Sequence, residues 1–220
     1  MLNAVSAGAR YEVLNLAVPG YNARQQRLNL EERGLTFVPD LVIVAFVLND
    51  ALPPAQLVPK AARVPLSLRR ILKRFLLVQL LAARAKRVPA ILAGRRFKGG
   101  SEMADLAPGT PGWLTVEESL LEVKRLAGSG SAVLLLVIWP MFEALDAHYP
   151  FAAQHEQLAR FCSQHGIEAL DLLPSFQGSK PEALWVARDD HHPNGEAQRR
   201  AAGAIFEGLR RLGFVAPRSA

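Results

Sequence analysis

The stretch Asp40–Phe46, DLVIVAF, determines the fold class of this 220-residue chain. It is a continuous run of apolar, largely β-branched residues, which is typical of a strand buried on both faces of a parallel sheet. Ser131–Ile138 (SAVLLLVI) repeats the pattern. Shorter strands are expected at Tyr11–Ala17 and Ile167–Asp171. We therefore expect at least four strands that alternate with helices.

Helix signals lie between the expected strands. Asn22 can cap a helix to about Arg33, and a capping box from Thr115 to Glu118 predicts a helix to about Ala127. A third helix is expected over Ala152–His165, with its inward face formed by Leu158, Phe161 and Cys162. Asn194 can cap a last helix, with an inward stripe formed by Ala201, Ile205, Phe206, Leu209 and Leu212. The alternation predicts an α/β fold with right-handed crossovers and a parallel sheet covered on both faces.

The composition fits one globular domain over residues 1–220. Half of the residues are hydrophobic and 21% are charged, which is too apolar for a disordered chain. The single cysteine, Cys162, excludes an internal disulfide and a multi-cysteine metal cluster but leaves the compartment undetermined. Residues 1–13 lack the basic and apolar regions of a signal peptide.

The positive charge is concentrated in an insert at residues 51–112. Of the 26 Lys and Arg residues, twelve lie between Ala51 and Ser101, where there is no Asp or Glu. The rest of the chain carries 14 basic and 20 acidic groups, so its net charge is negative. Leu68–Arg87 within the insert has the spacing of an amphipathic helix. Three interpretations of the insert stay open: a lid over a pocket, a helix resting on anionic lipid, or a solvated basic face.

The insert is not expected to cross a membrane or to bind nucleic acid. Its longest apolar run, Phe75–Ala83, is interrupted by Gln79 and is much shorter than the roughly 18 residues that a spanning helix needs. Residues 60–98 are the candidate contact with an anionic membrane surface. Binding of nucleic acid is disfavoured because the aromatic residues of the insert are limited to Phe75 and Phe97.

Three short motifs could carry chemistry at the carboxyl ends of the strands, where function gathers in such folds. In the run DDHHPN, the Asp189 carboxylate can orient a histidine three residues later, so that the other ring nitrogen acts as a general base. Asn49, followed by Asp50, comes directly after a buried strand, where a side-chain amide can donate to an oxyanion. Gly20 could offer a backbone N–H for the same purpose. Each motif alone also fits an ordinary polar turn.

In this order, the motifs resemble the SGNH (GDSL-like) hydrolase family. LNLAVPGYN is similar to the glycine block of that family, VIVAFVLND to its asparagine block, and WVARDDHHPNGEAQRRAA to its Asp–His block. The resemblance extends from Met1 to about Leu212, with the basic insert as the least familiar part. It implies a three-layer, flavodoxin-like α/β fold and hydrolysis of a carboxylic ester through an acyl-serine intermediate.

The resemblance also implies roles for individual residues. Gly20 and Asn49 would donate hydrogen bonds in an oxyanion hole, His192 would be the base that activates serine, and Asp189 would orient His192. His191 is the less favoured base because the family places its catalytic histidine directly before proline. The implied substrate is a small-molecule, lipid or acylated-sugar ester, with no metal and no organic cofactor.

The serine block of the family is absent from this sequence. The only serine before the glycine block is Ser6, which follows no strand and no Asp. In the family, the serine and its strand precede the segment where this chain begins, so the fold is expected to lack its N-terminal strand. Two interpretations remain: a fragment of a longer hydrolase, or a divergent non-catalytic copy. The intact glycine, asparagine and Asp–His blocks favour the first, and no other residue is assigned as nucleophile.

We therefore expect an SGNH-type ester hydrolase domain with little or no activity in the chain as it stands. The alternative is a non-catalytic binding or membrane-surface protein that uses the basic insert. A flavodoxin-like nucleotide binder is disfavoured, because the segment at Tyr11–Ala17 leads into PGYNAR rather than into a phosphate-cradling glycine loop.

Overall fold

A computed structural model describes residues 2–5, 10–52, 106–143, 145 and 148–215. Its centre is a parallel sheet in which β1 (Leu41–Val47), β2 (Val133–Trp139) and β3 (Glu168–Asp171) lie in the order β1-β2-β3. The predicted α/β class with a parallel sheet is confirmed. The strands at 40–46, 131–138 and 167–171 are confirmed with boundaries shifted by one or two residues.

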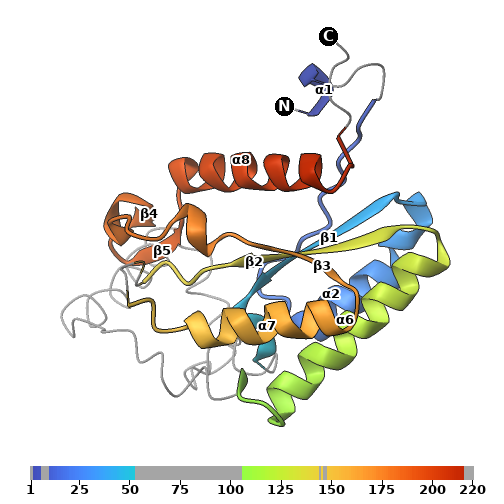
Figure 1. Ribbon diagram of the computed structural model, residues 1–220, viewed down its shortest axis with the longest axis horizontal. Helices are drawn as coiled ribbons and strands as arrows, with labels where there is room; N and C mark the ends of the chain where they lie inside the picture. Colours follow the sequence, from blue (N-terminus) through green and yellow to red (C-terminus); the bar gives the residue numbers. More distant parts are fainter. Residues whose placement is uncertain (1, 6–9, 53–105, 144, 146–147, 216–220) are drawn as a thin grey trace, which may run out of the picture.

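Helices cover both faces of this sheet. Figure 1 shows α8 (Gly195–Arg211) on one face and α2 (Ala23–Glu32), α6 (Pro111–Ser129) and α7 (Ala152–Gln164) on the other. A separate antiparallel hairpin is formed by β4 (Trp185–Ala187) and β5 (Asp190–Pro193). The remaining short elements are α1 (Leu2–Val5) and the 3₁₀ turns η1 (Gly34–Phe37), η2 (Leu48–Ala51), η5 (Leu173–Ser175) and η6 (Pro181–Ala183).

The register of the sheet brings the three strand ends to one edge. Val47 at the end of β1 pairs with Trp139 at the end of β2. Ile138 pairs with Asp171, the last residue of β3. Any side chains that follow these strands therefore lie near one another.

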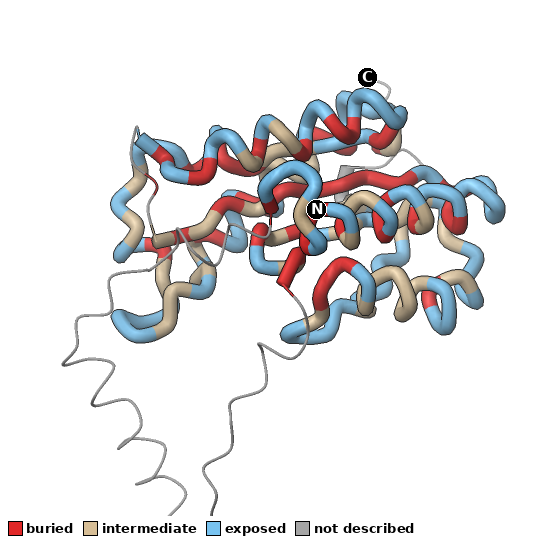
Figure 2. Tube along the Cα trace, turned by 90° about the horizontal axis from the view of Figure 1, so that it is seen from below, coloured by how far each residue is buried: buried red, intermediate tan, exposed pale blue. Residues whose placement is uncertain are grey.

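The core is centred on β2. Residues Leu134–Ile138 of this strand are all buried, and Figure 2 shows further buried positions on the inward sides of the helices. The predicted inward residues of α7, Leu158, Phe161 and Cys162, are buried as expected. Burial raises the pKa of the Cys162 thiol to about 11, so the thiol stays protonated and has no character of a nucleophile at neutral pH.

Two of the predicted helix caps are confirmed, and one helix begins at a different residue from the predicted one. Asn22 and Asn194 cap α2 and α8, as predicted. The helix predicted from Thr115 begins earlier, because Thr110 is the actual cap and Pro111 occupies the first helical position. The Thr115 hydroxyl instead donates to the Pro111 carbonyl inside the helix.

Helix α8 packs closely on β3. A Cβ atom at Gly208 would lie 2.9 Å from Leu170 Cδ2, so the absence of a side chain permits this approach. Ala201 and Leu209 of the predicted stripe are buried and Ile205 and Phe206 are partly buried, whereas Leu212 is 37% exposed.

The prediction of a strand at Tyr11–Ala17 is wrong. The segment is not assigned to a strand, and no strand among the described residues pairs with it. Side chains hold it instead: Asn29 Nδ2 donates to the Leu16 carbonyl (2.7 Å), and the Tyr11 hydroxyl donates to the Phe214 carbonyl (3.0 Å). Val13 and Leu14 of this segment are exposed, by 76% and 47%, whereas Leu16 is partly buried.

The expectation that β1 is buried on both faces is also wrong. Within the described residues β1 pairs only with β2, so it forms the edge of the sheet, and Ile43 is 43% exposed. The predicted amphipathic helix at Leu68–Arg87 and the membrane contact at 60–98 lie outside the described residues. No helix in the described part of the chain is long and apolar enough to span a bilayer.

Candidate functional site

Gly20 lies in a tight turn that leads into α2. The Tyr21 N–H donates to the Val18 carbonyl at 3.2 Å, with Pro19 and Gly20 at the centre of the turn. Gly20 has a φ of 81°, which a glycine after proline adopts at low cost in a type II turn. Val18, Pro19 and Gly20 of the turn are exposed.

Asn49 lies in η2, directly after β1, and its side chain is exposed. The neighbouring Asp50 holds the shape of this turn. Its Oδ2 atom accepts from the Val47 N–H (3.0 Å) and from Gln26 Nε2 in α2 (2.9 Å). The carbonyl of Asn49 accepts from the Leu52 N–H (3.0 Å).

The structure brings the Gly20 and Asn49 turns together through the buried side chain of Asn22. Asn22 Oδ1 accepts from the Gln25 N–H (3.0 Å), which caps α2, while Nδ2 donates to the Leu52 carbonyl (3.0 Å). One amide thus joins the start of α2, two residues after Gly20, to the end of η2, three residues after Asn49. The bond between Gln26 and Asp50 makes a second connection.

Burial raises the pKa of Asp50 from 3.8 to about 6, although the hydrogen bonds from Val47 and Gln26 act in the opposite direction. The folded protein therefore binds a proton at Asp50 more tightly than the unfolded chain does.

We expect the contribution of Asp50 to the free energy of unfolding to decrease as the pH rises from about 4 to about 6. Above this range the folded chain carries a partly buried charge. Relative to Asp50→Asn, the wild type should lose about 2 kcal/mol across this window. Urea denaturation at pH 4, 5, 6 and 7 measures both proteins. A difference between them that is independent of pH would contradict the shift.

Asp190–Pro193 (DHHP) forms strand β5 of the hairpin, whereas Asp189 lies in the turn between β4 and β5. His192 is exposed, with 86% of its side chain accessible, and its Nδ1 lies 2.5 Å from Asp190 Oδ1. The carboxylate beside His192 is therefore that of Asp190, whereas the predicted orienting residue is Asp189. The Asn194 side chain ties the hairpin to α8, because its Nδ2 donates to the Trp185 carbonyl (3.2 Å).

The neighbouring His191 lies in a more enclosed position, with 33% of its side chain exposed. Its ring stacks on Trp185 with centroids 4.0 Å apart, and Nδ1 lies 3.8 Å from Glu143 Oε1. Within the described residues, Glu143 Oε2 is buried without a hydrogen-bond partner. Glu143 follows β2, so the hairpin lies beside the carboxyl edge of the sheet.

A buried polar network at the same edge was not predicted from the sequence. His155 Nδ1 lies 2.9 Å from Asp171 Oδ1, and His155 Nε2 lies 3.3 Å from the Tyr149 hydroxyl. His155 precedes Leu158 by about one helical turn, so the sequence could have predicted that His155 lies on the inward face of α7. Its partners come from other elements, and no spacing in the sequence indicated them.

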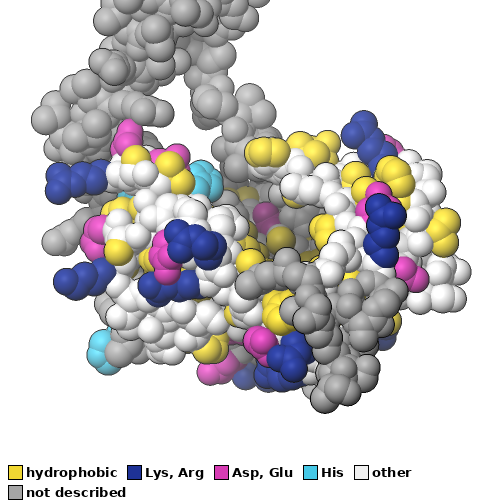
Figure 3. Space-filling view, turned by 90° about the horizontal axis from the view of Figure 1, so that it is seen from above, with side chains coloured by type: hydrophobic (Ala, Val, Ile, Leu, Met, Phe, Trp, Pro, Cys, Tyr) yellow, Lys and Arg dark blue, Asp and Glu magenta, His cyan; other side chains and the backbone are white. Residues whose placement is uncertain are grey.

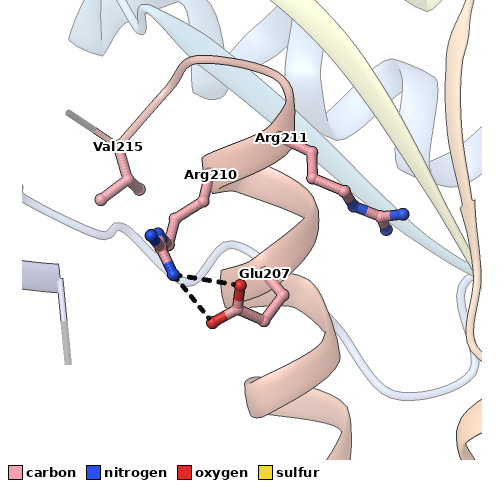
Figure 4. A pocket seen from close by; sticks show the side chains of 4 residues that line it. All are labelled: Glu207, Arg210, Arg211 and Val215. Carbon is pink, nitrogen blue, oxygen red and sulfur yellow. Dashed lines mark hydrogen bonds and ion pairs between the residues drawn. The ribbon is translucent and has the colours of Figure 1, made fainter. Parts of the chain in front are cut away.

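A surface pocket lies at the other end of α8 and is not part of this site. Figure 4 shows it lined by Glu207, Arg210, Arg211 and Val215, with an ion pair between Arg210 and Glu207 at 3.3 Å. Basic and acidic side chains are also interspersed over the face seen in Figure 3. This described face is therefore of mixed charge.

No family model, curated protein or solved structure matched this chain. Among the described residues, no group of three or more His, Cys, Asp or Glu side chains could hold a metal ion.

Proposed function

We propose that this chain carries the oxyanion-binding and acid–base parts of an SGNH-type carboxylic ester hydrolase. The observation that carries the proposal is the Asn22 bridge, which places the Gly20 and Asn49 turns together beside the end of β1. The parallel sheet and the histidine-bearing hairpin near the end of β2 support it, since catalytic groups gather at this edge in open α/β sheets.

In the proposed reaction, a serine hydroxyl attacks the carbonyl carbon of an ester. His192 takes the hydroxyl proton, while the Gly20 N–H and the Asn49 amide donate to the oxygen that becomes negative. The C–O bond to the alcohol then breaks, and the alcohol leaves with the proton from His192. Water attacks the acyl-serine in the same manner and releases the acid.

The serine is the part that this sequence does not supply in a recognised block. We therefore expect the 220-residue chain to show no His192-dependent hydrolysis of p-nitrophenyl acetate. Extending the reading frame upstream should add an apolar strand followed by Gly-Asp-Ser, and the extended protein should hydrolyse the ester. An upstream frame without such a block would contradict the proposal that the chain is part of a longer hydrolase.

A second candidate function rests on the charge of the insert. Twelve basic and no acidic residues between Ala51 and Ser101 fit an anionic membrane surface. Co-sedimentation with vesicles containing phosphatidylserine tests it. Binding that is lost when Arg69, Arg70, Lys73 and Arg74 are neutralised together would support a membrane-surface role, and equal binding of the variant would oppose it.

A further inference from the structure

The buried network of Tyr149, His155 and Asp171 joins three elements at the carboxyl edge of the sheet. Asp171 ends β3, His155 lies in the first turn of α7, and Tyr149 lies in the segment between β2 and α7. The hydroxyl of Tyr149 also accepts from the Met141 N–H at 2.7 Å, just after β2. Asp171 Oδ1 in turn accepts from the Leu173 N–H at 2.8 Å.

The contacts of this network fit an arrangement in which His155 carries its proton on Nδ1. The carboxylate of Asp171 can only accept, so His155 donates through Nδ1–H. With the proton of His155 on Nδ1, Nε2 can accept the proton of the Tyr149 hydroxyl, whose oxygen accepts from the Met141 N–H. Burial raises the pKa of Tyr149, which keeps the hydroxyl protonated for this bond. His155 thus connects the end of β3 to the segment after β2.

The segment that Tyr149 holds is the one that contacts the hairpin. The carbonyl of Phe142 accepts from the indole N–H of Trp185 at 2.7 Å. The next residue, Glu143, faces His191, whose ring stacks on Trp185. Displacing Met141 would therefore move the two contacts that this segment makes with the hairpin, from Phe142 to Trp185 and from Glu143 to His191.

We propose that His155 is a positioning residue for the candidate base. Through Tyr149 and Met141 it fixes the Phe142–Glu143 segment, and this segment holds the β4–β5 hairpin that presents His192. The role of His192 as a base rests on the proposed function, whereas the coupling of His155 to the hairpin does not.

The test uses the indole N–H of Trp185 in the 220-residue chain as a probe. A ¹⁵N–¹H spectrum contains three indole signals, and Trp185→Phe identifies the one of interest. Tyr149→Phe removes only the hydroxyl and should raise the exchange rate of the Trp185 N–H about tenfold. His155→Leu should do the same, because it removes the partner of that hydroxyl.

Ser119→Ala is the matched control. It also deletes a buried hydroxyl with one hydrogen bond, to the Thr115 carbonyl in α6, far along the chain from the hairpin. It should leave the Trp185 signal and its exchange unchanged relative to the other two indoles.

Two results would overturn the proposal. Tyr149→Phe could leave the Trp185 exchange rate at its wild-type value, or it could accelerate exchange at Trp113 and Trp139 to the same extent. The second result would mean that the network stabilises the whole domain rather than the hairpin. Neither readout depends on ester hydrolysis. An inactive extended protein would therefore contradict the proposed function without affecting the proposal that His155 positions the hairpin.

Discussion

Replacing Asn22 with alanine is expected to lower the free energy of unfolding by about 2–4 kcal/mol. The substitution removes the cap of α2, which leaves the Gln25 N–H without its acceptor. It also removes the donor to the Leu52 carbonyl in a buried position. The two losses add because they affect separate backbone groups. Urea denaturation, followed by circular dichroism, measures the change.

Asn22→Ser separates the two roles of this side chain. Serine retains an acceptor for the cap but is too short to reach Leu52. Its stability should therefore lie between those of the wild type and Asn22→Ala. Equal stability of Asn22→Ser and the wild type would show that the connection between the Gly20 and Asn49 turns contributes nothing.

In an upstream-extended protein that hydrolyses p-nitrophenyl acetate, His192→Ala is expected to reduce kcat by about 10²–10⁴-fold. The loss follows because no other group would remove the proton of the attacking serine. The reduction should appear in kcat more than in KM, since the histidine acts in the transition state. Steady-state kinetics at several pH values measures both parameters.

His165→Ala is the control for this prediction, because His165 lies at the far end of α7 and bonds to the Phe161 carbonyl. It should retain wild-type kinetics.

Comparison of Asp189→Asn with Asp190→Asn identifies the carboxylate that orients His192, since the structure places Asp190 beside it. A loss of kcat that follows His191→Ala but not His192→Ala would contradict the assignment of the base.

The elements that could be predicted from the sequence are those in which local signals agree with burial. DLVIVAF and SAVLLLVI form paired strands, and Asn22 and Asn194 cap the expected helices. In each case the local pattern and the tertiary environment favour the same structure. The strand predicted at Tyr11–Ala17 did not form. A strand needs a neighbouring strand to pair with, and the pattern of a single segment does not specify one.

The candidate site was predictable only in part, for a similar reason. Gly20 and Asn49 follow strand or turn signals that can be read locally, and Asn22 was recognised only as a cap. Its second bond, to Leu52, spans 30 residues and has no local signature. The contacts of His155 with Asp171 and of His191 with Glu143 are likewise long-range, so only the fold brings these groups together.

Covalent labelling tests whether this chain supplies the oxyanion hole and the base of a serine hydrolase site, as we propose. A fluorophosphonate reacts with a serine only when a base and an oxyanion hole activate it. We predict one adduct per molecule on the upstream-extended protein, located on the serine of a Gly-Asp-Ser block and abolished by His192→Ala. An extended protein that takes up no label, or that is labelled equally after His192→Ala, would contradict the proposed function.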